Sequence, residues 1–170
     1  AVVEVTGITE DGRLIPSSSV GNNKTWLDQA EKVILEVNSW QNPALEGMHD
    51  IYYGTQLPPF RQPIPLVKTS DRIGEPYLKV DPNKVIAVVE THQADRNSGF
   101  SAPDEGSRKI AGHILEFLEH EVKMGRLPKE LLPLQSGVGN IANAVLSGLN
   151  QGPFENLTAY TEVLQDGMLD

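Results

Sequence analysis

The sequence predicts an α/β protein with parallel or mixed β-sheets, on the basis of three observations. Two stretches rich in β-branched residues, 2–8 and 32–38, have the composition of strands. A run at 85–90 is apolar on both faces, which is typical of a strand in a parallel sheet. Apolar residues at every fourth position predict a long helix over 104–125.

The segments between these elements are short or irregular. The turn dipeptide Asp11-Gly12 precedes a short edge strand expected at 13–16. A short helix capped by Thr25 is expected over 25–30. Prolines are frequent in residues 39–83 and exclude long helices and central strands there. We expect this segment to be a long excursion that is functional or wraps another domain or subunit.

The long helix has recognisable ends. Ser101 is a candidate cap that is followed by Pro103 and acidic residues. The helix is expected to end near Gly125, before Pro128. As the longest regular element of the chain, it is the candidate connection between two domains. Its apolar stripe consists of Ile110, Ile114, Leu118 and Val122.

The last forty residues predict a βαβ unit: a strand at 131–135, a glycine loop at 136–140, a helix, and a strand at 157–163. Parallel strands end at the sheet edge where such folds bind ligands. Amides of the loop could face an anion there, and Glu162 would lie near the end of the second strand. A carboxylate beside free amides suits a nucleophile and its oxyanion hole. The same spacing is also compatible with a non-functional alternative, in which Glu162 is a solvent-exposed residue at a strand end and the glycine loop is an ordinary tight turn.

Composition argues against several other classes of function. The net charge of −9 and the pI near 4.9 disfavour electrostatic binding of nucleic acid. With no cysteine, a disulfide scaffold, a thiolate metal site and a cysteine nucleophile are excluded. The glycine loop lacks both nucleotide-binding fingerprints, and no Gly-x-Ser-x-Gly elbow is present. The histidines lack metal-ligand spacing, so we expect no metal, and no run of about 20 apolar residues suggests a membrane span.

Two C-terminal motifs carry a resemblance to a known family: residues 132–145, and residues 160–166 after a characteristic separation. They resemble the acetyl-CoA hydrolase/transferase family, whose CoA-transferases include succinyl-CoA:acetate CoA-transferase. The similarity runs over all 170 residues. Further matching stretches are 8–12 with 19–21, 110–117 and 121–128.

The resemblance implies a mechanism. Glu162 would be the covalent nucleophile that attacks an acyl-CoA thioester, giving first an acyl-glutamyl anhydride and then a glutamyl-CoA thioester. The amide of Val138 would stabilise the oxyanion, and Gly137 and Gly139 would let the backbone approach the substrate. Further candidates for the acyl or CoA pocket are Ser136, Asn140 and Asn143.

The resemblance also implies a fragment of a two-domain enzyme about three times this length. Residues 1–103 would be the later part of the N-terminal CoA-transferase domain, 104–125 the connecting helix and 126–170 the start of the C-terminal domain. We expect the fragment alone to be inactive, and the whole protein to be a cytoplasmic or mitochondrial homodimer.

The expected partners are an acyl-CoA, such as acetyl- or succinyl-CoA, and small carboxylates such as acetate or succinate. Coenzyme A would be a substrate, with no separate cofactor. Two alternatives stay open at this point: an acetyl-CoA hydrolase that releases acetate and CoA, and a non-catalytic module for binding or assembly.

Overall fold

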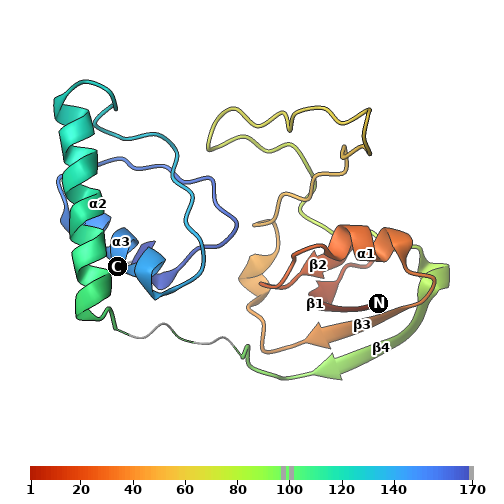
Figure 1. Cartoon of the computed structure of the whole chain (residues 1–170). Coiled ribbons are helices and arrows are strands. Elements are labelled where there is room, and N and C mark those ends of the chain that lie inside the picture. The colour runs from red at the N-terminus through yellow and green to blue at the C-terminus, as the bar shows by residue number, and fades with distance from the viewer. Residues whose placement is uncertain (97–98, 100–101, 169–170) are drawn as a thin grey trace. The chain divides into compact units, whose positions relative to one another are not determined.

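The computed structural model describes residues 1–96, 99 and 102–168. The chain divides into two compact units, Ala1–Arg96 and Asn97–Asp170, and each has its own hydrophobic core (Figure 1). In the described parts, no helix is long and apolar enough to cross a membrane.

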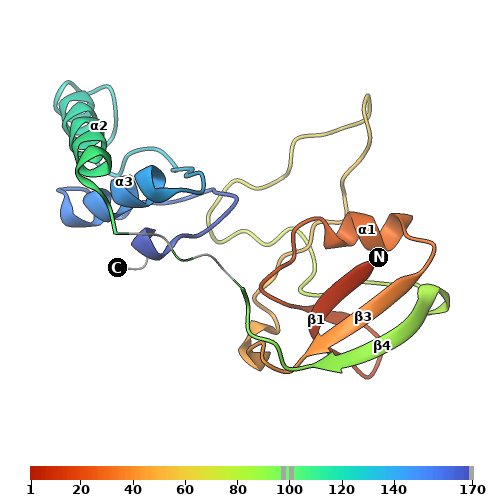
Figure 2. The same ribbon diagram turned by 60° about the horizontal axis from the view of Figure 1, so that its bottom comes forward.

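The first unit is built on a four-stranded mixed sheet in the order β2-β1-β3-β4. Its strands are β1 (Val2–Ile8), β2 (Leu14–Pro16), β3 (Val33–Asn38) and β4 (Val85–Thr91). β3 pairs in parallel with both β1 and β4 (Figure 2), while β2 returns antiparallel to β1 at the edge. The parallel pairing and the edge strand confirm the sequence prediction.

The core of this unit lies on one face of the sheet. Alternate residues of β1 and β3 point to this face, as the period of two in their apolar pattern requires. Helix α1 (Asn23–Gln29) covers it with Leu27, which is 2% exposed (Figure 1). The prediction that Thr25 caps this helix is wrong, because the helix begins at Asn23 and Asn22 is its N-cap. The buried core residues are Val3, Val5, Leu14, Leu27, Val33, Leu35 and Leu78.

Strand β4 is less buried than its composition suggests. Ile86 and Val88 are 58% and 53% exposed. β4 is the outer strand of the described sheet, and within residues 1–96 it pairs only with β3. The apolar composition of β4 on both faces therefore predicted its parallel pairing correctly. The burial of both faces that usually accompanies such a composition is not found in this unit.

The proline-rich segment is irregular, as predicted. Residues 39–84 contain two short 3₁₀ turns, Pro43–Leu45 and Pro82–Lys84, each capped by the side chain before the proline. Isolated bridges join Ile51 to Glu75 and Leu14 to Leu78. Between Ile51 and Glu75 the chain forms a long arm that extends away from the sheet (Figure 1). Leu57, Phe60 and Val67 are exposed on this arm.

The second unit packs helix α2 (Glu105–Lys123) against helix α3 (Asn140–Gln151). The buried residues of its hydrophobic cluster are Leu131, Leu146 and Leu149, which pack against apolar side chains of α2. α2 confirms the predicted helix, with Asp104 as its N-cap. The candidate cap Ser101 lies outside the described residues. The predicted domain boundaries, including the connecting role of 104–125, stay predictions.

The two strands predicted around α3 are wrong as regular strands. In their place, one parallel bridge joins Leu134 to Ala159, with Leu134 N–H donating to the Thr158 carbonyl and Tyr160 N–H to the Leu134 carbonyl, both at 2.9 Å. Leu131 has a φ of 55°, outside the strand region, and the Ser136 N–H, which would make the next bond of this ladder, donates to Thr161 Oγ1 at 3.3 Å instead. The parallel strand pairing expected in the βαβ unit is therefore limited to one pair of residues.

Candidate functional site

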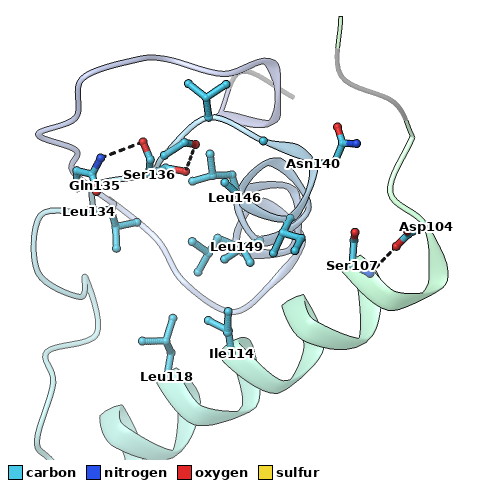
Figure 3. Close-up of a pocket in the computed structure, with 16 residues that line it drawn as sticks. Asp104, Ser107, Ile114, Leu118, Leu134, Gln135, Ser136, Asn140, Leu146 and Leu149 are labelled. Atoms are coloured by element: carbon cyan, nitrogen blue, oxygen red, sulfur yellow. Dashed lines mark hydrogen bonds between the residues drawn. The ribbon is translucent and has the colours of Figure 1, made fainter.

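A cavity of about 830 Å³ lies in the second unit, bordered by α2, by the start of α3 and by the glycine loop (Figure 3). Its apolar wall comes from both helices, where Ile114 and Leu118 of α2 lie opposite Leu149 of α3 (Figure 3). The polar groups come from the helix starts and the loop. They are Asp104, Ser107, Gln135, Ser136 and Asn140. The cavity therefore joins an apolar wall to polar residues of the helix starts and the glycine loop.

The glycine loop takes its shape from Gly139. This residue is the N-cap of α3 and has φ 145° and ψ 164°, a conformation that side-chain-bearing residues rarely adopt. Its carbonyl accepts the N–H of Asn143 at 3.0 Å, which starts the helix. Val138, just before it, lines the cavity and is 74% exposed. Of the predicted site residues, Ser136, Gly137, Val138, Gly139 and Asn140 all line this one cavity.

Glu162 lies in a bend after the bridge, and its side chain is exposed. It is not among the described residues that line the cavity. Its neighbours nevertheless contact the glycine loop. The hydroxyl of Thr161 donates to the Ser136 carbonyl at 3.1 Å and accepts the Ser136 N–H at 3.3 Å. The structure therefore brings the segment of Glu162 to the loop, while the Glu162 carboxylate itself stays in solvent.

Asn143, predicted as a pocket residue, has a structural contact. Its side-chain oxygen accepts the backbone N–H of Gly167 at 2.9 Å and so holds the 3₁₀ turn Asp166–Met168. Asn143 is not among the described lining residues of the cavity. Its part in substrate binding stays a prediction.

Sequence reasoning missed several residues of this region. Gln165, 3% exposed, donates from its side-chain amide to Ser136 Oγ at 3.1 Å and to the Gly137 carbonyl. Asp104 and Ser107 fall within the helix predicted at 104–125, and nothing in the sequence pattern marks them as cavity residues. Gln165 lies inside a matching motif, but nothing in its spacing indicates a contact with a loop 28 residues earlier.

Asp104 is the one ionisable side chain among the described lining residues. Its Oδ1 accepts the Ser107 N–H at 2.6 Å, and this backbone hydrogen bond holds the pKa of the Asp104 carboxyl below its usual range. The charge also suits the positive end of the α2 dipole. Within the described residues, no cluster of three or more His, Asp or Glu side chains could hold a metal.

Residues 1–90 match the family model of the acetyl-CoA hydrolase/transferase N-terminal domain, which is more than half of the chain. The chain belongs to the acetyl-CoA hydrolase/transferase family. Solved structures agree on the fold. RipA from Yersinia pestis aligns over 99% of the chain with a TM-score of 0.60 at 20% identity, and 4-hydroxybutyrate CoA-transferase from Porphyromonas gingivalis with 0.55 at 20%. At these identities the likeness shows a shared CoA-transferase fold.

Family members of higher identity fall under two names. An acetyl-CoA hydrolase of Schizosaccharomyces pombe is 52% identical over 169 residues, and one of Yarrowia lipolytica is 51% identical over 170 residues. A succinyl-CoA:acetate CoA-transferase of Clostridium kluyveri is 46% identical over 169 residues. Almost all of this chain is aligned in each case, but it spans only 31–32% of these relatives' lengths.

Proposed function

We propose that the protein containing this chain moves CoA between an acyl-CoA and a carboxylic acid through a glutamyl-CoA thioester on Glu162. The observation that carries the proposal is the contact between the two motif segments. Thr161, adjacent to Glu162, makes two hydrogen bonds to Ser136 at the start of the glycine loop. A candidate nucleophile and candidate oxyanion donors are thereby held on neighbouring segments, as acyl transfer requires.

In the proposed reaction, a Glu162 oxygen forms a bond to the thioester carbonyl carbon of the acyl-CoA. The carbonyl electrons pass to its oxygen, which the Val138 N–H stabilises, and they return as the CoA thiolate leaves. The thiolate then attacks the Glu162 carbonyl of the anhydride, which releases the first acid and leaves glutamyl-CoA. A second carboxylate reverses these steps and departs as the new acyl-CoA. A carboxylate nucleophile needs no general base, because the attacking oxygen has no proton to lose.

Hydrolysis is a second candidate with its own support, because the S. pombe and Y. lipolytica relatives are named acetyl-CoA hydrolases. Water would then attack the covalent intermediate on Glu162, in place of the second carboxylate that the transferase uses. Both candidates share the first covalent step on Glu162. The dependence of acetyl-CoA consumption on added succinate separates them, because only the transferase needs an acceptor acid, and acetate as acceptor would merely regenerate acetyl-CoA.

The decisive experiment traps the covalent intermediate in the intact protein. After incubation with acetyl-CoA, borohydride should reduce the Glu162 thioester to an alcohol, which peptide mass spectrometry locates. Glu162→Gln should abolish both the modification and turnover. Glu155→Gln is the matched control, since Glu155 is an equally exposed glutamate seven positions earlier. Normal turnover by Glu162→Gln would refute the mechanism.

A further inference from the structure

Gln165 is a buried polar residue without an assigned task. It lies three positions after Glu162 and is 3% exposed. Both hydrogens of its side-chain amide are used on the glycine loop, one by Ser136 Oγ and one by the Gly137 carbonyl. Its side-chain oxygen has no hydrogen-bond partner among the described residues. Burying an unpaired oxygen is costly, so stability alone gives a weak reason for glutamine here.

Gln165 binds the carbonyl of the peptide group that also carries the Val138 N–H, the candidate oxyanion donor. Gly137 C=O and Val138 N–H are the two ends of one peptide unit. The peptide is planar, and in its trans form these two bonds point in opposite directions. A donor that fixes the Gly137 oxygen therefore also fixes the direction of the Val138 N–H, which points away from Gln165.

The surroundings of the loop agree with this geometry. Val138 lines the cavity, whereas Gln165 is buried and is not among the described lining residues. Without a restraint this peptide could rotate more readily than most, because Gly137, which precedes it, has no side chain to restrict its ψ. Thr161 anchors the two preceding peptides, one through the Ser136 N–H and one through the Ser136 carbonyl. The segment of Glu162 therefore contacts the loop at two successive carbonyls.

We propose that Gln165 is a positioning residue that orients the Val138 N–H toward the developing oxyanion and ties it to the segment that carries Glu162. The inference rests on the proposed function of those two residues. The hydrogen bond to the Gly137 carbonyl also polarises the peptide, which makes its N–H a stronger donor. Gln165 itself touches neither substrate nor reacting atoms in this proposal.

The test compares Gln165→Met with wild type in the intact protein. Methionine has a similar length but cannot donate to the Gly137 carbonyl. Loss of an oxyanion donor lowers kcat by about 10²–10³, and misorientation of a donor that is still present should lower kcat about 10–100-fold. KM for acetyl-CoA should change less than about threefold, because the interaction strengthens only in the transition state.

Asn150→Leu is the matched control. Asn150 donates its side-chain amide to the Gly167 carbonyl at 2.9 Å, so it makes a similar bond to a backbone segment of the same unit without contacting the glycine loop. It should retain wild-type kcat. If Gln165→Met does not fold, as judged by circular dichroism, Gln165→Glu keeps the length, loses the amide donors and is judged by the same criterion.

The outcomes separate the two proposals. If wild type forms the borohydride-reduced Glu162 adduct and the Gln165 variant keeps kcat within about twofold of wild type, the positioning role is overturned while the mechanism stands. An equal loss of kcat in Asn150→Leu would also overturn the positioning role. Absence of the adduct from wild type would instead overturn the proposed function.

Discussion

Replacing Gly139 by alanine tests the geometry on which the candidate site depends. Gly139 has φ 145° and ψ 164° at the N-cap of α3, a region that only glycine adopts readily. A Cβ built there meets no atom within 4 Å, so no steric clash contributes. The whole penalty comes from the backbone, and for such conformations it is about 1–3 kcal/mol.

Gly137 supplies the matched control two positions earlier. Its φ lies outside the positive range, and a Cβ there also meets nothing within 4 Å. Alanine at such a position restricts the unfolded chain and is expected to stabilise the protein by about 0.4–1 kcal/mol. The two variants should therefore differ by about 1.4–4 kcal/mol in the free energy of unfolding.

The assay is urea unfolding of the intact protein followed by circular dichroism, with kcat measured on the same samples. We expect Gly139→Ala to lower both the unfolding midpoint and kcat, because relief of the strain would rotate the Val138 peptide. Gly137→Ala should keep the midpoint at or above that of wild type. Equal midpoints for the two variants would refute the argument that the conformation of Gly139 determines the shape of the loop.

Two further predictions concern the second unit. Leu149→Ala removes a core side chain that is 4% exposed and should lower the free energy of unfolding by about 2–5 kcal/mol. Leu132→Ala, at a position 60% exposed, should change the free energy of unfolding by less than about 0.5 kcal/mol. Similar urea midpoints for the two variants would contradict the assigned core. Asp104→Asn keeps a capping oxygen but removes the charge. Because the folded pKa of Asp104 is lowered, the charge stabilises the fold above the ordinary value of 3.8 and this contribution is lost as the pH falls through the folded pKa. The difference in melting temperature between wild type and Asp104→Asn should therefore shrink in acid, and a constant difference across pH would count against a charge effect.

Local patterns in the sequence were sufficient to predict the regular elements. Period-two alternation in β1 and β3 reports a face that is buried, so there the pattern and the structure have the same cause. The apolar stripe of α2 predicts the helix correctly, but only Leu118 and Val122 of it pack against the core, while Ile110 and Ile114 are 42% and 37% exposed. The pattern was misleading at 131–135 and 157–163. There the positive φ of Leu131 and the hydrogen bond from the Ser136 N–H to Thr161 Oγ1 limit pairing to one bridge despite an apolar composition.

The sequence by itself determined the elements of the fold, the family resemblance and the choice of Glu162 with the glycine loop. The tertiary structure alone decided which groups support that loop. Thr161 and Gln165 bind Ser136 and Gly137 across 25 to 29 positions of chain. Such hydrogen bonds depend on how the backbone folds back on itself, and a single polar side chain leaves no periodic pattern that would indicate its partner.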